Sequence, residues 1–144
     1  HPRRSVVISG AGDRRDEDIR GQTRILGASF DDVILYQDAC QRGRADGEVL
    51  ALLREGLQGA ARTTHVEEIT GEFIAIDRAL GQLQAGDLCL ILIDQVEEAL
   101  AHIQRRVDEA ANAQPKPAPR AAAKTVRKPR RSKIATTVAL GLRL

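Results

Sequence analysis

The apolar and polar positions of this chain follow two periods that alternate along its first hundred residues. Compact apolar runs at 5–9, 32–36 and 88–93 are typical of buried strands, and 64–69 alternates like a strand with one wetter face. Between these runs, apolar residues recur every three or four positions, which is typical of helices with one buried face. The four predicted helices carry Ile19, Thr23, Leu26 and Phe30; Val49, Leu50, Leu53 and Leu57; Phe73, Ile76, Leu80 and Leu83; and Val96, Leu100, Ile103 and Val107.

The resulting order, β-α-β-α-β-α-β-α, predicts an α/β fold. Strands that read as continuous apolar runs are typical of a sheet covered by helices on both faces. Connections between parallel strands are right-handed, so helices pack back onto the sheet. We therefore expect a Rossmann-like, doubly wound, mostly parallel sheet, with 88–93 as its strongest strand. Gly27 is expected to end the first helix and Asp46 to cap the second.

Charge divides the chain into two parts. Residues 1–110 hold 13 arginines, no lysine and 20 acidic residues, a net charge of −7. Residues 111–144 hold four lysines, five arginines and no acid, a net charge of +9, with four prolines among alanines. Such a segment buries too little apolar surface to offset the entropy of ordering it. We expect an α/β domain over 1–110 and a largely disordered basic tail over 111–144.

Several protein classes are disfavoured by composition. No apolar run approaches the roughly 18 residues of a membrane span, and no signal-peptide pattern follows His1. Cys40 and Cys89 form no CxxC pair and are too few for a disulfide scaffold, so we expect no metal site and a reducing cytoplasm. His1 stands where an initiator methionine would, so we expect a fragment of a longer protein.

The loop after the first strand is the first candidate for chemistry, because parallel sheets bind ligands beyond the carboxyl ends of their strands. It opens like a dinucleotide fingerprint, but Arg15 occupies the place of the third glycine, which disfavours nicotinamide binding. Its backbone amides and guanidinium groups suit phosphate or carboxylate. The alternative is a tight turn with solvated Arg–Asp pairs. The candidate residues are Gly12, Asp13, Arg14, Arg15 and Asp16.

The loop after the second strand, 37–46, is the second candidate. Asp38, Arg42 and Arg44 flank a flexible Gly43, and the loop leaves the next strand in sequence, so we expect it to lie beside the first. The alternative is an ordinary surface loop. The chain contains no GxxxxGKS or GxxxxGKT pattern, so any nucleotide phosphates must be held by a P-loop from elsewhere.

Four segments together resemble the C-terminal domain of the Mur ligase family, in particular its cyanophycin synthetase branch. These are residues 9–20, 33–38, 41–49 and 88–100, and the resemblance covers about 4–104. The turn at 12–16 is similar to the family's GGDRD turn, from which Ala11 and the doubled arginine depart. The loop 37–44 stands in the place of a DNPR loop that reads the amino-acid substrate: Asp38 matches, and either Arg42 or Arg44 stands for the final arginine. The family's first strand and helix would precede His1, and a lysine often found near the phosphates is missing.

The resemblance implies the C-terminal domain of an ATP-dependent ligase that adds arginine to the side-chain carboxylates of poly-aspartate, giving cyanophycin through an acyl phosphate. ATP and Mg²⁺ would be bound mainly by a central P-loop ATPase domain, with an ATP-grasp domain adding the backbone aspartate. This chain alone would be inactive, and the enzyme a homo-oligomer. Our hypothesis is that Arg14 and Arg15 orient anionic groups, while Asp13, Asp16 or Asp38 engages a cationic one.

Two other interpretations stay open at this stage. The chain is compatible with another Mur-type ligase, acting on muramoyl peptides or folylpolyglutamate. It is also compatible with a non-catalytic module whose basic tail binds a polyanion. Nucleic acid is disfavoured as that partner, because only 2% of the residues are aromatic and stacking platforms are lacking.

Overall fold

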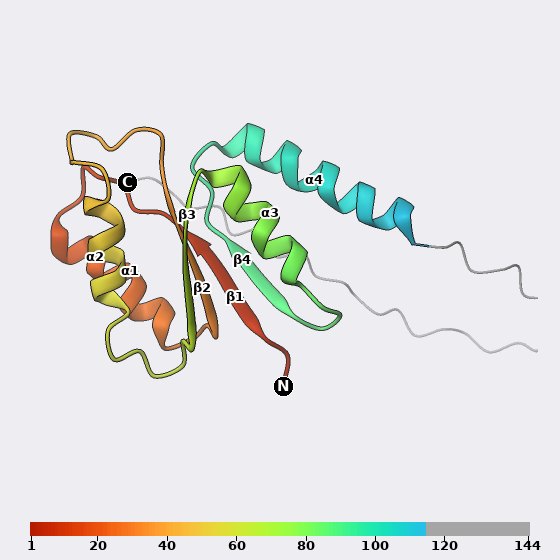
Figure 1. Ribbon diagram of the computed structural model, residues 1–144, viewed down its shortest axis with the longest axis horizontal. Coiled ribbons are helices and arrows are strands. Elements are labelled where there is room, and N and C mark those ends of the chain that lie inside the picture. Colours follow the sequence, from red (N-terminus) through yellow and green to blue (C-terminus); the bar gives the residue numbers. More distant parts are fainter. Residues whose placement is uncertain (115–144) are drawn as a thin grey trace, which may run out of the picture.

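A computed structural model describes residues 1–114 and confirms the predicted alternation of strands and helices (Figure 1). The elements are β1 (Arg4–Ile8), α1 (Asp16–Gly27), β2 (Asp32–Gln37), α2 (Glu48–Gly56), β3 (His65–Thr70), α3 (Glu72–Gln82), β4 (Leu88–Ile91) and α4 (Val96–Ala113). The strands form one four-stranded sheet in the order β3-β2-β1-β4, and every neighbouring pair is parallel. The predicted Rossmann-like α/β fold is therefore confirmed.

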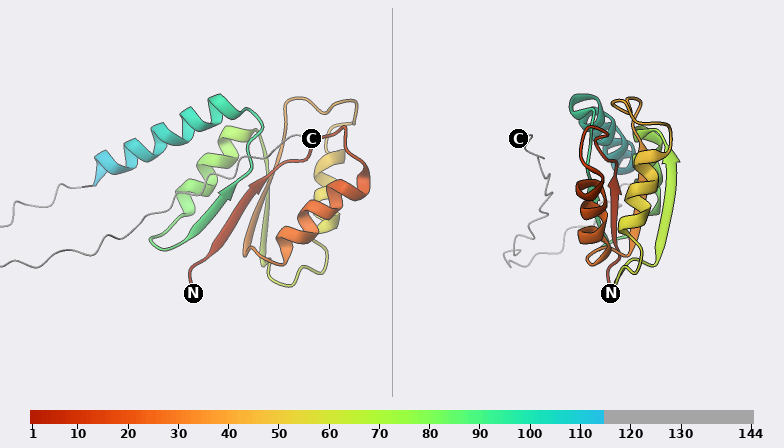
Figure 2. Two further views of the ribbon diagram at one scale, coloured as in Figure 1. Left: turned by 180° about the vertical axis from the view of Figure 1, so that it is seen from behind. Right: turned by 90° about the vertical axis from the view of Figure 1, so that its left-hand side faces the viewer.

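Helices cover the two faces of the sheet. Figure 1 shows α1 and α2 on one side of the strands and α3 on the other, and the right-hand view of Figure 2 looks through α1 and α2 onto the sheet. Successive residues of each strand point to opposite faces of the sheet and therefore belong to two different core clusters. Val6 and Val33 join the core beneath α1 and α2, whereas Val7 and Ile34 pack against α3. The central strands β1 and β2 are thus buried on both faces, which explains their continuous apolar sequences.

The chain reverses its direction across the sheet once. It steps from β1 to β2 to β3, and then crosses back along α3 to place β4 on the far side of β1. In open parallel sheets this reversal opens a crevice at the carboxyl ends of the two strands that flank it. Here the flanking strands are β1 and β4, so the fold itself draws attention to the loops that follow them.

The prediction that 88–93 is the strongest strand was wrong. β4 covers only Leu88–Ile91 and lies at the edge of the sheet, where the Leu88 side chain is 53% exposed. Apolar runs report burial but do not distinguish a central strand from an edge strand. The central place belongs to β1 and β2, whose residues are the most deeply buried.

The prediction that Asp46 caps the second helix was also wrong. The residue at the cap position of α2 is Gly47, in the left-handed conformation with φ of 79°, and no side chain caps the helix. The Gly47 amide instead donates to the side-chain oxygen of Gln37 at 2.8 Å, and the Glu48 carboxylate accepts from the Ala45 amide at 3.0 Å. Glycine adopts positive φ at little cost, so the chain enters the helix one residue later than the sequence signal indicated.

The last helix is longer than the apolar periodicity of the sequence indicates. α4 continues beyond Glu109 to Ala113, since Ala110, Ala111 and Ala113 are strong helix formers. The disorder predicted for the basic tail falls almost wholly on 115–144, outside the described residues. Within residues 1–114, no helix combines the length and apolar character needed to cross a membrane.

Helices α1 and α2 approach each other closely. The hydroxyl of Thr23, fully buried in α1, donates to the backbone carbonyl of Leu53 in α2 at 2.6 Å. A methyl group at Gly56 would collide with the Thr23 hydroxyl and with the Arg20 carbonyl oxygen. The absence of a side chain at Gly56 is therefore what lets the two helices meet over the sheet.

We predict that Gly56→Ala lowers the free energy of unfolding by about 2–3 kcal/mol, because the added methyl overpacks a backbone contact. The matched control is Gly21→Ala in α1, where a methyl would meet nothing within 4 Å. That change raises the free energy of unfolding by about 0.5–1 kcal/mol through helix propensity. Urea unfolding of both variants measures the difference, and equal effects would contradict the close approach.

Candidate functional site

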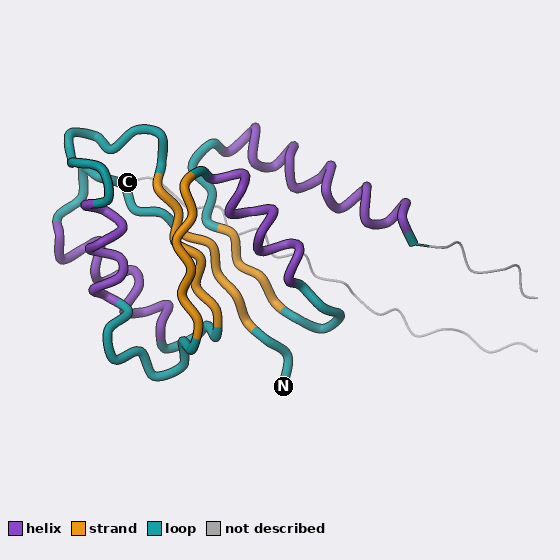
Figure 3. Tube along the Cα trace, in the orientation of Figure 1, coloured by secondary structure: helices purple, strands orange, loops and turns teal. Residues whose placement is uncertain are grey.

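The loops of interest meet at one edge of the sheet. The segments after β1 (9–15), β2 (38–47), β3 (71) and β4 (92–95) all leave the carboxyl ends of parallel strands. Figure 3 shows them as teal segments at the upper ends of the strands. The two loops singled out from the sequence are in direct contact, because a Cβ atom at Gly12 would collide with the backbone oxygen of Gln41. The prediction that they lie side by side is confirmed.

Arg44 joins these two loops. Its guanidinium donates to the backbone carbonyls of Gly12 and Arg14, both at 2.7 Å, and lies 2.8 Å from the carboxylates of Asp16 and Glu48. The Arg44 side chain is only 16% exposed. Its hydrogen-bonding capacity is spent within the protein, so in this structure Arg44 and Asp16 fix the loops rather than face a ligand.

Two further pairs lie on the outside of the same loops. Arg42 contacts the Asp13 carboxylate at 3.3 Å, and Arg15 binds Asp18 through two hydrogen bonds of 2.9 and 3.1 Å. All four side chains are substantially exposed, so each pair contributes little to stability. For these residues the structure agrees with the simpler interpretation, a turn with solvated Arg–Asp pairs.

Arg14 differs from its neighbours. Its side chain is exposed, and among residues 1–114 it makes no hydrogen bond or ion pair through its guanidinium. Its backbone carbonyl is held by Arg44, so the side chain starts from a fixed position. A guanidinium in this state can bind phosphate or carboxylate without first breaking an internal pair.

A cavity of about 560 Å³ opens beside the second loop. Its walls come from the ends of β2, β3 and β4, and apolar contact is provided by Phe73 and Ile74. Among residues 1–114, no lysine, arginine or histidine lines it. The acidic residues of its lining are Asp38, Asp46, Glu72 and Asp94.

Asp38 is the most perturbed carboxyl group in this region. Burial raises its pKa, the negative charges of Asp94 and Glu72 raise it further, and the value reaches about 6. The Ser9 hydroxyl, which donates to the Asp38 carboxylate at 3.0 Å, and the charge of Arg42 act in the opposite direction. Asp38 therefore carries a poorly solvated negative charge at neutral pH, which a cationic ligand would stabilise.

Glu72 and Tyr36 are two residues of this region that the sequence did not single out. Glu72 is only 6% exposed, and its two oxygens accept the backbone amides of Asp94 at 2.9 Å and Gln95 at 3.2 Å. The buried Tyr36 hydroxyl donates to the Leu92 carbonyl at 2.9 Å. The only available signal was position: Glu72 follows directly after the third predicted strand, and Tyr36 ends the apolar run of the second.

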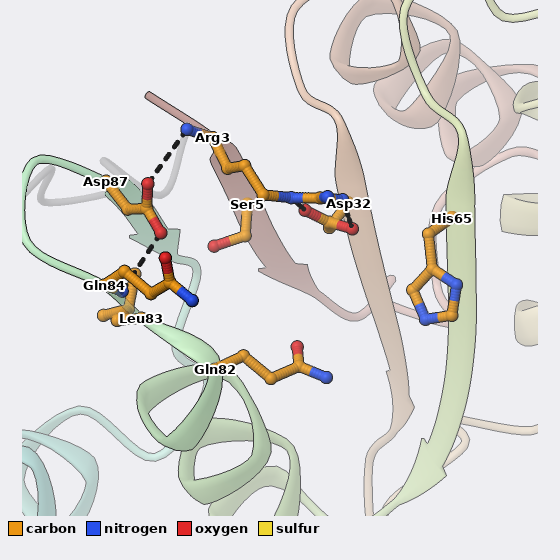
Figure 4. A pocket seen from close by; sticks show the side chains of 8 residues that line it. All are labelled: Arg3, Ser5, Asp32, His65, Gln82, Leu83, Gln84 and Asp87. Carbon is orange, nitrogen blue, oxygen red and sulfur yellow. Dashed lines mark hydrogen bonds and ion pairs between the residues drawn. The ribbon is translucent and has the colours of Figure 1, made fainter. Parts of the chain in front are cut away.

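A second cavity, of about 350 Å³, lies at the opposite edge of the sheet (Figure 4). Arg3 spans it and binds Asp32 through hydrogen bonds of 2.9 and 2.6 Å, while His65 lines another side. This edge holds the amino ends of the parallel strands, where ligands of such sheets do not bind. The one guanidinium in its lining is already paired, so we place the site at the carboxyl edge.

The residues present do not form a complete ATP site. The sequence has no P-loop, and within residues 1–114 no group of three or more metal-ligating side chains is arranged to hold an ion. In the described part of the chain, Arg14 is the arginine of these two loops whose guanidinium has no internal partner. Residues 1–114 by themselves therefore do not provide the groups that would hold ATP and Mg²⁺.

Comparison with known proteins gives one consistent result. The chain matches no family model. It is 35% identical over 100 residues to the cyanophycin synthetase of Crocosphaera subtropica, 69% of this chain and 12% of that protein. It is 32% identical over 106 residues to that of Synechocystis sp., 74% of this chain and 12% of that protein, and 34% identical over 100 residues to that of Trichormus variabilis, 69% and 11%. The chain thus resembles one short segment of these enzymes and spans about an eighth of their length.

We predict that Arg44→Ala lowers the denaturant midpoint of unfolding clearly more than Arg42→Ala, because two backbone carbonyls and two carboxylates lose their shared partner. Arg42→Ala is the control: it removes an arginine from the same loop but breaks a single exposed pair, and should cost less than about 0.5 kcal/mol. Chemical unfolding of both variants provides the measurement. A similar cost for the two would show that Arg44 does not hold the loops together.

A second prediction concerns pH. The pKa of Asp38 lies above its ordinary value of 3.8, so the folded protein binds more protons than the unfolded chain between about pH 4 and 6. Stability therefore falls as pH rises through this window. Asp38→Asn keeps an acceptor for Ser9 but removes the charge. It should raise the free energy of unfolding by about 1–2 kcal/mol at pH 8, after allowance for partial exposure.

The effect of Asp38→Asn should vanish at low pH, because the wild-type carboxyl is then protonated in the folded and unfolded states alike. Thermal unfolding of both proteins between pH 3 and pH 8 provides the test. A constant difference across this range would mean that the Asp38 charge is not the destabilising group.

Proposed function

We propose that this chain is the C-terminal, substrate- and ATP-closing domain of an ATP-dependent acid–amino-acid ligase of the cyanophycin synthetase kind. The reaction is the joining of arginine to a side-chain carboxylate of poly-aspartate through an acyl phosphate. The similarity to a segment of several cyanophycin synthetases supports this proposal. In this proposal a separate P-loop domain binds ATP and Mg²⁺. That domain also carries out the first step, in which the side-chain carboxylate is phosphorylated to an acyl phosphate.

The acid-lined cavity is the observation that carries the proposal. In the described part of the chain, four acidic residues and no basic residue line a space of about 560 Å³, within the range of roughly 300–1,000 Å³ that is common for small-molecule sites. Such a lining favours a ligand with positive charge and an extended aliphatic stem, which can pack on Phe73 and Ile74. Arginine, the amino acid that a ligase of this kind adds, has both features.

In this proposal the two loops bind different parts of the substrates. Asp38 holds the cationic side chain of the amino acid, and the cation in turn keeps the Asp38 carboxyl ionised. Arg14, on the neighbouring loop, faces the anionic partner. Because Arg44 ties the two loops together, the positions for cation and anion keep a fixed separation, and this alignment is what an amine and an activated carboxylate need.

The other candidate ligases differ in the charge of the added amino acid. A folylpolyglutamate-type enzyme adds glutamate, whose side chain is anionic. A cavity with four acidic residues and no basic residue repels that side chain, so the geometry favours a cationic amino acid. We propose no polyanion-binding role, because the basic tail on which it would depend lies outside the described residues.

We predict that Asp38→Ala and Arg14→Ala each lower arginine incorporation by about tenfold or more in the full-length ligase, since each removes a charged contact worth about 1.4 kcal/mol or more. The controls are Glu109→Ala and Arg24→Ala, which remove exposed charges of the same type away from the carboxyl edge. Radiolabelled arginine incorporation gives the rates. Wild-type kinetics in both Asp38→Ala and Arg14→Ala would remove this edge from the active site.

Competition identifies the amino acid. Citrulline has the shape of arginine without its charge, so it should compete poorly, whereas glutamate should not compete at all. Effective competition by citrulline would show that the acidic lining does not select its ligand by charge. Preferred incorporation of glutamate would instead indicate a folylpolyglutamate-type ligase.

A further inference from the structure

Glu72 connects two parts of the fold that are distant along the sheet. It opens α3 directly after β3, which forms one edge of the sheet. Its carboxylate accepts hydrogen bonds from the backbone amides of Asp94 and Gln95. These two residues belong to the turn after β4, which is the outermost strand on the opposite side of the sheet from β3. The start of α3 thus reaches across the carboxyl ends of the intervening strands and holds the turn that leads into α4.

Burying the Glu72 carboxylate costs desolvation free energy, which its hydrogen bonds must offset. A carboxylate that is 6% exposed must be fully hydrogen bonded, and here each oxygen has its own backbone donor. Glu72 lies in the first turn of α3, and its donors lie at the entrance of α4, so the positive ends of two helix dipoles face one charge. Gly71, with φ of 103°, permits the sharp turn that brings the side chain there.

The held turn contributes to the acid-lined cavity. Asp94 follows the anchored Leu92 carbonyl and lines the same cavity as Asp38. The negative charges of Asp94 and Glu72 both raise the pKa of Asp38, in keeping with their common place in the cavity lining. Asp94 has its place in the cavity because its backbone amide is bound by Glu72.

We propose that Glu72 is a positioning residue for the cationic amino acid: by binding the turn after β4, it keeps Asp94 facing the cavity opposite Asp38. The identity of the ligand rests on the proposed function. Glu72 itself does not touch the reacting atoms. It sets the affinity for the amino acid through Asp94 and leaves the rate of the chemical step unchanged.

The test is steady-state kinetics of the full-length ligase with Glu72→Gln. Glutamine retains one oxygen for the Asp94 amide, but its NH₂ group cannot accept from Gln95. We expect KM for arginine to rise about tenfold, with kcat within about twofold of wild type and KM for ATP unchanged. The control is Glu97→Gln, the same chemical change in the first turn of α4 at an exposed position, which should leave all three constants unchanged.

A double-mutant cycle separates positioning from general damage. If Glu72 acts through Asp94, then Asp94→Asn alone also raises KM for arginine, and Glu72→Gln adds little in the Asp94→Asn background. Additive effects, or a fall in kcat and a rise in KM for ATP together with that for arginine, would overturn the inference. Asp94→Asn also serves if Glu72→Gln fails to fold, since a wild-type KM in that variant is equally decisive.

The Asp38→Ala variant distinguishes failure of the proposed function from failure of the positioning role of Glu72. If Asp38→Ala leaves KM for arginine unchanged, the cavity does not bind the amino acid and the proposed function fails. If Asp38→Ala raises KM while Glu72→Gln and Asp94→Asn do not, the function stands and only the positioning role of Glu72 is rejected.

Discussion

The guanidinium of Arg44 is the contact on which the carboxyl edge depends. A planar group with five donors can bind two carbonyls and two carboxylates at once, and Arg44 does so between two loops that follow different strands. Gly12 makes this possible, because it has no side chain to hold the loop backbones apart. Without that tie, two glycine-containing loops would have many conformations available. With it, the two loops that carry Arg14 and Asp38 are bonded to each other.

The charged side chains at the carboxyl ends of the strands are of two kinds: those that form ion pairs with a neighbouring side chain and those that do not. Arg15, Arg42 and Asp13 lie in pairs whose charges cancel locally. Among residues 1–114, Arg14 and Asp38 have no such ion-pair partner; Arg14 is exposed to solvent and Asp38 is half-buried beside other acids. A surface loop without a function would have no reason to keep a poorly solvated carboxylate, since an asparagine would fit the same place with less electrostatic cost. Arg14 and Asp38 are therefore the residues to which we assign ligand contacts.

The sequence predicted the fold well because its signals are local. Apolar periodicity located the strands and helices of residues 1–114, and the alternating order left few topologies to consider. Where several local signals compete, the prediction failed. Asp46 is a good cap by residue type, but Gly47 could take a backbone conformation that Asp46 would adopt only with strain. The edge position of β4 was not visible either, since strand order depends on where α3 crosses the sheet and not on the apolar content of the strand.

The site was less predictable because its decisive contacts join residues far apart in sequence. Charge and position identified Asp38, but its raised pKa comes first from burial and then from the charges of Asp94 and Glu72, which follow other strands of the sheet. The same holds for Arg44, a candidate ligand contact whose guanidinium binds the backbone carbonyls of Gly12 and Arg14 in the other loop. A buried carboxylate held by two amides, as in Glu72, is costly to form and gives nothing to the apolar core. Among residues 1–114, Thr23 is the other polar residue that is buried, so we connect the presence of Glu72 with the cavity that it borders.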